Sequence, residues 1–198
     1  SFVEGEYIVG LIAESILKKN PGEKVVHDPR VIWNTQLAIR QNKGTAVLSK
    51  TGHSFLKQKM REENAIYGGE LSAHHYFRDF AYCDSGMIPW LLMAELISTR
   101  NKSLSELVAE RKKLFLSSGE INFHIQSPDK ALERITSYYG DSAEDINRLD
   151  GISISFRNWR LNLRKSNTEP LVRLNVEVKS DYSLLENKLE EINDLLKE

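Results

Sequence analysis

Apolar and polar positions in the first part of the chain follow two different periods. Apolar residues recur at helical spacing in five segments, which predicts helices over residues 7–19, 31–41, 54–62, 85–99 and 104–114. Short apolar runs between turn residues predict strands over residues 24–27, 45–49 and 65–67. Helices that alternate with short apolar strands are typical of a parallel sheet covered on both faces. This part is therefore predicted to be a three-layer α/β domain.

The pattern changes after residues 117–119, which read Ser-Ser-Gly. Beyond them, apolar alternation predicts strands over residues 121–125, 152–156, 159–163 and 172–178, and helical spacing predicts helices over residues 128–139 and 183–197. Short connections between strands indicate an antiparallel sheet with helices on one face, a smaller α+β domain. We therefore expect a remnant of a preceding domain (1–5), an α/β domain (6–118) and an α+β domain (119–198).

The amino-acid composition limits the classes of binding partner and the cellular compartment that we expect for this protein. The chain has 198 residues, is 40% hydrophobic and 28% charged, and carries a formal net charge of −1. So small a charge creates no field that would select nucleic acid or an anionic membrane. Cys83 is the single cysteine, so no internal disulfide can form and a reducing compartment is natural. No apolar run approaches the length of a membrane span. We expect a cytoplasmic protein without nucleic-acid or membrane partners.

Polar side chains follow each predicted parallel strand. Arg30 comes after the first strand, His53 after the second, and a polar loop, residues 70–74, after the third. Open parallel sheets bind ligands beyond the carboxyl ends of their strands. The polar groups are therefore expected to gather at one rim of the sheet.

The third of these loops follows a glycine pair, residues 68–69, at which we expect the strand to end and the chain to turn sharply. If the chain beyond the pair is extended, Glu70, Ser72 and His74 share one face, because side chains alternate along a strand. A carboxylate can accept hydrogen bonds from two hydroxyl groups at once, which suits a sugar diol. A polar hairpin tip with a chance alternation remains the alternative.

A second polar loop lies in the α+β domain, between two predicted antiparallel strands. Residues 164–168 carry a guanidinium, two hydroxyls and an amide, on Arg164, Ser166, Asn167 and Thr168. Such groups, together with backbone N–H groups, can surround a phosphate. Ser, Asn and Thr are also common turn residues, so a plain hairpin loop is the alternative.

Two motifs resemble one enzyme family. Residues 69–74 read Gly-Glu-Leu-Ser-Ala-His and resemble the sugar-binding loop of the α-D-phosphohexomutases, usually Gly-Glu-Met-Ser-Gly-His. Residues 164–170 read Arg-Lys-Ser-Asn-Thr-Glu-Pro and resemble the phosphate-binding loop of the same family. The resemblance extends over essentially the whole chain and is nearest to bacterial members that act on mannose phosphates. The departures, Leu71 and Ala73, are mild substitutions.

The resemblance implies a reaction and a role for each residue. The parent enzyme would interconvert mannose 6-phosphate and mannose 1-phosphate through a phosphoserine and a bisphosphorylated sugar, with the glucose pair as a second candidate. Glu70 and Ser72 would hold sugar hydroxyls, and Arg30, His53 and His74 would supply charge and handle protons near the reacting phosphate.

The phosphate loop would anchor the phosphate that does not react, through Arg164, Ser166, Asn167 and Thr168. The sequence contains no Ser-His-Asn-Pro-like stretch and no Asp-x-Asp-x-Asp cluster, so the nucleophilic serine and the magnesium ligands are not in this chain. We expect the C-terminal part of a phosphohexomutase, inactive alone, whose missing N-terminal domains bind magnesium. Glucose or mannose 1,6-bisphosphate would be the activator.

Two other functions are compatible with the same residues. A non-catalytic phosphosugar-binding module would have the same site without turnover. A hydrolase that uses Glu70 and His74 as an acid–base pair is a weaker alternative.

Overall fold

The computed structural model describes residues 3–166 and 169–197. The chain divides into two compact units, Ser1–Lys113 and Leu114–Glu198. This division falls before the Ser-Ser-Gly segment at residues 117–119, which lies inside a strand, β6 (Leu116–His124), and does not form a linker. None of the helices in the described part of the chain is long and apolar enough to span a bilayer.

A five-stranded sheet forms the centre of the first unit, in the order β2-β1-β3-β4-β5. β1 (Lys24–His27) pairs in parallel with β2 (Thr45–Leu48) and β3 (Tyr67–Gly69). β4 (His75–Phe77) and β5 (Cys83–Asp84) extend the sheet as antiparallel strands. The predicted parallel strands are confirmed. The antiparallel hairpin was not predicted, because strands this short show no recognisable alternation.

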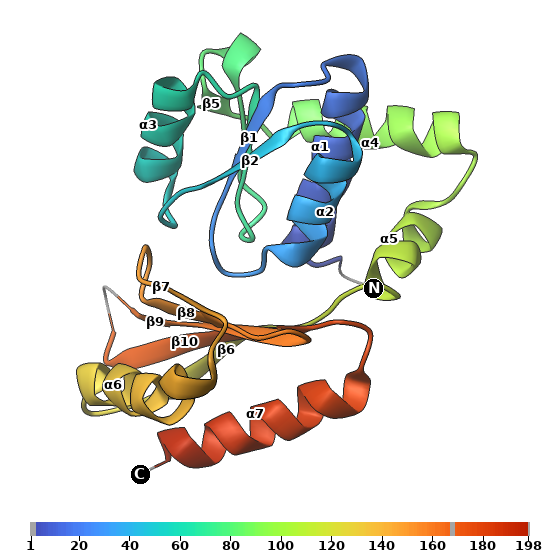
Figure 1. Cartoon of the computed structure of the whole chain (residues 1–198). Coiled ribbons are helices and arrows are strands. Elements are labelled where there is room, and N and C mark those ends of the chain that lie inside the picture. The colour runs from blue at the N-terminus through green and yellow to red at the C-terminus, as the bar shows by residue number, and fades with distance from the viewer. Residues whose placement is uncertain (1–2, 167–168, 198) are drawn as a thin grey trace. The chain divides into compact units, whose positions relative to one another are not determined.

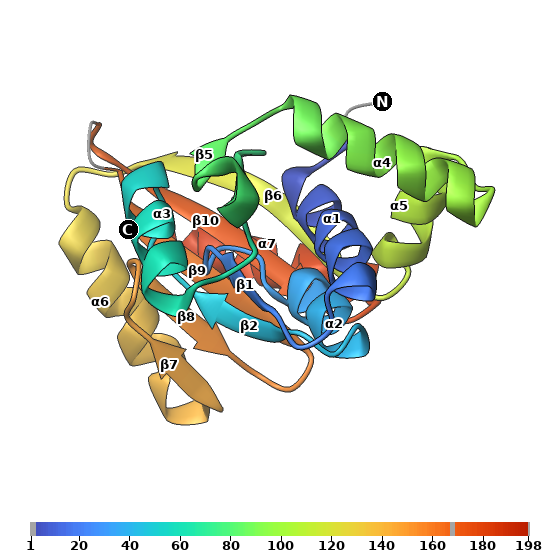
Figure 2. The same cartoon turned by 90° about the horizontal axis from the view of Figure 1, so that it is seen from above.

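The described residues of this unit form five α-helices: α1 (Gly5–Lys19), α2 (Trp33–Gln41), α3 (His53–Glu63), α4 (Met87–Arg100) and α5 (Leu104–Lys112). They confirm the predicted helices to within a few residues. α1 and α2 cover one face of the sheet and α3 covers the other (Figure 1). α4 and α5 pack on α1, as the view in Figure 2 shows. A short 3-10 helix, η1 (Arg78–Phe80), joins β4 to β5.

Each face of the sheet has its own hydrophobic core. Val25 belongs to the core on the α1 face, together with Ile12. The next residue, Val26, belongs to the core on the α3 face, together with Leu56 and Met60. Neighbouring residues of a strand point to opposite faces, so a strand covered on both sides must be apolar throughout. This explains why the parallel strands read as short apolar runs, and it confirms the three-layer α/β prediction.

The glycine pair at residues 68–69 does not turn the chain. Both glycines lie within β3, two residues beyond the predicted strand end. A Cβ atom on Gly68 would lie 2.5 Å from the Met60 Sδ atom, and one on Gly69 would lie 2.7 Å from Val9 Cγ1. The missing side chains therefore let α3 and α1 pack closely against the strand.

The second unit is an antiparallel sheet in the order β6-β10-β9-β8-β7, with two α-helices on one face (Figure 1). Its further elements are α6 (Pro128–Tyr139), a 3-10 turn η2 (Gly140–Ser142), β7 (Asp145–Asn147), β8 (Ile152–Ser155), β9 (Trp159–Lys165), β10 (Leu171–Val178) and α7 (Tyr182–Leu196). The core includes Ile135 of α6, Ile192 of α7, and Leu161 and Leu174 of the sheet. The α+β prediction is confirmed; η2 and β7 were not predicted.

The face of this sheet opposite the two helices is polar. Asn162 donates from Nδ2 to the Ser153 hydroxyl at 3.0 Å. Arg160 forms an ion pair with Glu177 at 2.7 Å. These residues alternate along the strands with those of the apolar core. Arg164 continues the same polar row, so the sheet itself determines the face on which its side chain emerges.

The packing of β3 against α3 predicts the effect of one substitution. Gly68→Ala should lower the free energy of unfolding by about 1–3 kcal/mol, because an added methyl overpacks the core. Its Cβ atom would lie 2.5 Å from Met60 Sδ and 2.7 Å from Leu56 Cδ2. Gly86→Ala is the matched control, since that glycine has φ −88° and no atom within 4 Å of an added Cβ. Urea denaturation followed by circular dichroism would measure both. Equal losses would contradict this explanation.

Candidate functional site

Two carboxylates join the three loops that follow the parallel strands. Asp28, after β1, accepts a hydrogen bond at Oδ2 from the backbone N–H of Leu71 at 2.8 Å. Glu70, after β3, accepts one at Oε2 from the backbone N–H of Gly52 at 3.0 Å. The loop after β3 is therefore bonded to the loop after β1 and to the loop after β2. The prediction that these polar segments gather at one rim is confirmed.

Arg30 is held within this rim by Asp28. The Arg30 Nη2 atom lies 2.7 Å from Asp28 Oδ2, and the Arg30 backbone N–H donates to Oδ1 at 3.0 Å. The two side chains are only 6% and 3% exposed. Burial alone would raise the pKa of Asp28, but the charge and hydrogen bonds of Arg30 and the Leu71 N–H lower it. Sequence reasoning missed Asp28, although it directly follows the strand and the rim rule could have found it.

The loop after β3 is a tight turn and not an extended segment. The Ala73 N–H donates to the Glu70 carbonyl, and the Glu70 N–H donates to the His74 carbonyl, both at 3.0 Å. The expectation that Glu70, Ser72 and His74 share one face of an extended chain is therefore wrong. Glu70 is buried at the base of the turn, whereas Ser72 and His74 are exposed.

Glu70 has a second partner besides Gly52. The Tyr76 hydroxyl donates to Oε1 at 2.8 Å. Burial and this bond to a carboxylate raise the pKa of Tyr76 far above its usual value. Each Glu70 oxygen thus already accepts one protein hydrogen bond. A carboxylate offers about four acceptor positions, so both oxygens keep lone pairs, although the residue is only 2% exposed.

The turn places Ala73 in the left-handed region, with φ +64°. Glycine adopts this conformation readily, whereas a residue with a Cβ atom is penalised by about 1–2 kcal/mol. This left-handed conformation explains why glycine suits this position in the motif that the loop resembles. Alanine in this chain keeps the turn at an energetic cost.

The adjacent histidines lie in different environments. His74 is exposed, and its Nδ1 lies 2.7 Å from Asp84 Oδ2. His75 is buried, and its Nδ1 lies 2.8 Å from the Tyr67 hydroxyl. Burial lowers the pKa of His75 to about 4, with Asp84 opposing and His74 adding to the effect. His75 is therefore neutral near pH 7 and structural. His74 is the histidine available to a ligand.

The polar groups of the rim that a ligand can reach lie on its outer, solvent-exposed side. Its inner hollow, lined by Asp28, Leu71 and their neighbours, measures only about 10 Å³. Such a volume holds at most one water molecule and no sugar. Ser72 and His74 are exposed, as is His53, the first residue of α3. A ligand too large for the hollow could reach only these outer groups.

In the second unit, Arg164 lies in β9 and not in the loop where we expected it. Its Nη2 atom forms an ion pair with Glu120 Oε2 at 2.8 Å. Arg173 binds the other oxygen of Glu120 at 2.9 Å. The arginine pair can supply two guanidinium groups to a phosphate, but that phosphate would have to compete with Glu120.

The remaining phosphate-loop residues are only partly described. The Ser166 N–H donates to the Leu171 carbonyl at 2.9 Å, where β9 and β10 separate. Asn167 and Thr168 lie outside the described residues. Their predicted role therefore stays a prediction.

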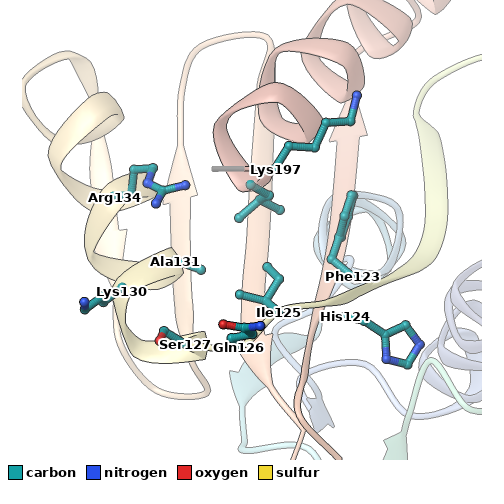
Figure 3. Close-up of a pocket in the computed structure, with 10 residues that line it drawn as sticks. Phe123, His124, Ile125, Gln126, Ser127, Lys130, Ala131, Arg134 and Lys197 are labelled. Atoms are coloured by element: carbon teal, nitrogen blue, oxygen red, sulfur yellow. The ribbon is translucent and has the colours of Figure 1, made fainter.

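A hollow of about 610 Å³ in the second unit lies beside α6 and the end of α7 (Figure 3). Its apolar lining is Phe123, Ile125, Ala131 and Leu196. Arg134 also lines it and donates to the Leu195 carbonyl at 2.7 Å, which joins the two helices. Of the predicted site residues that the structure describes, none lines this hollow.

Within residues 3–166 and 169–197, no group of three or more His, Cys, Asp or Glu side chains is arranged to hold a metal ion.

Comparison with known proteins matches both units. The family model "Phosphoglucomutase/phosphomannomutase, alpha/beta/alpha domain III" matches residues 4–115, and the model of the C-terminal domain matches residues 120–195. A phosphomannomutase of Escherichia coli is 58% identical over 197 residues, which is 100% of this chain and 43% of that protein. "Phosphohexose mutases" of Xanthomonas campestris is 56% identical over 196 residues, 99% of this chain and 44% of that protein.

A solved structure agrees with these matches. A phosphoglucomutase/phosphomannomutase family protein of Burkholderia thailandensis superposes with a TM-score of 0.83 and 25% identity. The match covers 100% of this chain and 42% of that protein. The chain thus spans somewhat less than half the length of the relatives that it matches.

The left-handed turn residue predicts a stabilising substitution. Ala73→Gly should raise the free energy of unfolding by about 0.5–1 kcal/mol, because relief of the left-handed strain exceeds the entropy cost of glycine. Ala94→Gly, at an exposed position within α4, is the control and should lower stability by about 1 kcal/mol. Urea denaturation measures both. A loss of stability in both variants would show that the turn is unstrained.

The two partners of Glu70 predict different costs for two substitutions. Glu70→Gln should cost only about 1 kcal/mol, because its oxygen can still accept from Gly52 while the Tyr76 hydroxyl reorients to accept from the amide. Glu70→Ala should cost about 2–4 kcal/mol, since it leaves the buried Tyr76 hydroxyl and the half-buried Gly52 N–H without their acceptor. Denaturant titration compares them. If Gln costs as much as Ala, the charge itself holds the loops.

Proposed function

The chain belongs to the phosphoglucomutase/phosphomannomutase family, and on that basis we propose that it is the substrate-recognition part of a phosphomannomutase. The observation that carries the proposal is the rim of the first unit, where Asp28 and Glu70 bond three loops together and leave Ser72 and His74 exposed. Because the chain spans about 43% of the matched relatives, the activity belongs to a longer protein.

The reaction of that longer protein is the interconversion of mannose 6-phosphate and mannose 1-phosphate, with the glucose phosphates as a second substrate pair. It proceeds through a phosphoserine and a bisphosphorylated sugar. Catalysis of phosphoryl transfer consists almost entirely of positioning and electrostatic stabilisation. A rim whose loops are already bonded to one another supplies this positioning without rearrangement.

The first unit provides the sugar contacts. Glu70 accepts sugar hydroxyls with its remaining lone pairs, and Ser72 offers an exposed hydroxyl beside it. Arg30 supplies positive charge near the reacting phosphate, and His53 and His74 handle protons there. In support, His53 and His74 are exposed on this rim.

The second unit provides the contacts to the phosphate that does not react. Arg164, Ser166, Asn167 and Thr168 form this group. The ion pair between Arg164 and Glu120 holds the guanidinium on the polar face of the sheet. A phosphate dianion attracts a guanidinium more strongly than a carboxylate does, so it can displace Glu120 as the partner.

The remaining components are placed outside this chain. The nucleophilic serine and the aspartates that bind magnesium belong to the preceding domains of the parent, and a 1,6-bisphosphate of glucose or mannose is the activator. We place the enzyme in the cytoplasm, without nucleic-acid or membrane partners. The high identity to named mutases favours this function over a non-catalytic phosphosugar sensor.

Turnover tests the proposal directly. The 198-residue chain incubated with mannose 1-phosphate, magnesium and glucose 1,6-bisphosphate should give no mannose 6-phosphate by phosphorus NMR, whereas the longer protein should convert it. In the longer protein, Ser72→Ala should raise KM by about two- to tenfold, as expected for one neutral hydrogen bond. Ser98→Ala removes a hydroxyl on α4 and is the control. Binding without turnover in the longer protein would identify a sensor, and turnover by the chain alone would refute the assigned role.

A further inference from the structure

We propose that Asp84 is the positioning residue of His74, fixing the imidazole with its hydrogen on Nδ1 and directing Nε2 to the substrate hydroxyl. The inference deepens the proposed function, on which it rests for the role of His74 in proton transfer. Nothing in the sequence motifs indicates Asp84, which lies ten residues further along the chain.

The backbone holds the Asp84 carboxylate in place. Asp84 is in β5 and pairs with Tyr76 of β4. Its Oδ1 accepts from the backbone N–H of His75 at 2.9 Å. The second oxygen, Oδ2, then lies 2.7 Å from His74 Nδ1. Since one oxygen is fixed on the main chain next to the histidine, the other has a defined position relative to the ring.

The chemistry of this pair determines the tautomer of the ring. An ionised carboxylate can only accept hydrogen bonds, so the Nδ1 atom facing it must carry the hydrogen. Asp84 is ionised near pH 7: partial burial would raise its pKa, but hydrogen bonds from the His75 N–H and the His74 ring lower it. The neutral ring of His74 therefore has its lone pair on Nε2.

The neighbouring histidine shows that this arrangement is specific to His74. The side chain of His74 is 53% exposed, so a ligand can reach its ring. His75 points to the other face, is 4% exposed and contacts the Tyr67 hydroxyl through Nδ1. Of the two adjacent imidazoles, the carboxylate is bonded to the ring of the accessible one.

The proposed step is a proton transfer with a defined direction. As the substrate hydroxyl oxygen forms its bond to phosphorus, the bond from phosphorus to the serine oxygen of the longer protein breaks and that oxygen is the leaving group. The O–H bond of the substrate breaks in the same step, and its proton passes to Nε2 of His74. The carboxylate of Asp84 stabilises the imidazolium that results. In the reverse half-reaction, the proton returns from Nε2 to the oxygen that leaves phosphorus. General acid–base catalysis of this kind contributes about a hundred- to ten-thousandfold to rates.

Nitrogen-15 NMR of the histidine rings tests the positioning in the 198-residue chain. At about pH 9, where histidine is ordinarily neutral, His74 should carry its hydrogen on Nδ1. Asp84→Asn should move it to Nε2, because the amide oxygen keeps the His75 N–H while the amide nitrogen donates to Nδ1. Asp79→Asn, at a side chain 85% exposed, is the control and should change nothing. A wild-type ring with its hydrogen on Nε2, or an unchanged tautomer in Asp84→Asn, would overturn the proposal.

Kinetics in the longer enzyme separate positioning from the wider function. Asp84→Asn should lower kcat at least about tenfold, a part of the general acid–base contribution, with KM changed by less than about twofold. Asp79→Asn should leave both unchanged. If His74→Ala lowers kcat and Asp84→Asn does not, positioning by Asp84 is refuted while the proposed function stands. If His74→Ala has no effect, the assigned role of His74 fails, whatever the NMR result.

Discussion

The hydrogen-bonding needs of two buried carboxylates shape the candidate site. A charged group out of water is strongly destabilised unless it is paired and hydrogen-bonded. Asp28 meets this need with Arg30 and the Leu71 N–H, and Glu70 meets it with Gly52 and Tyr76. Because the Leu71 and Gly52 N–H groups belong to other loops than the carboxylates they bind, no loop can move far without leaving a buried charge less well satisfied. The rim is therefore preorganised, which is what positioning a transferred phosphoryl group demands.

The architecture of this unit could be read from the sequence because it is encoded in local patterns. β1 has the predicted bounds. The rule for open parallel sheets correctly predicted that the loops after β1, β2 and β3 lie together. The hairpin of β4 and β5 could not be read, since strands of three and two residues carry too little pattern. The contact between His74 and Asp84 depends on that hairpin, so it could not be predicted either. Likewise, the glycine pair serves helix packing, a tertiary effect that no local signal distinguishes from a turn.

In the second unit, alternation predicted the strands but not the partners of the side chains. The ion pairs of Glu120 with Arg164 and Arg173 join three strands, β6, β9 and β10. The contacts of Glu120 with the two arginines depend on strand order and register, and one register shift occurs in the β6–β10 pair itself. The spacing of residues along the sequence reveals neither the strand order nor the register. A residue assigned to a loop by its resemblance to a motif can thus lie in a strand, with a carboxylate already beside it.

The left-handed turn at Ala73 bears on how such loops diverge during evolution. The residue there must satisfy a backbone angle before it satisfies any ligand. Alanine strains that angle by an amount that is small beside the roughly 5–15 kcal/mol that keeps a typical domain folded. The turn that places Glu70 and His74 therefore forms with alanine at this position as well as with glycine. The requirement at this position is therefore a left-handed backbone conformation, and more than one residue type can meet it.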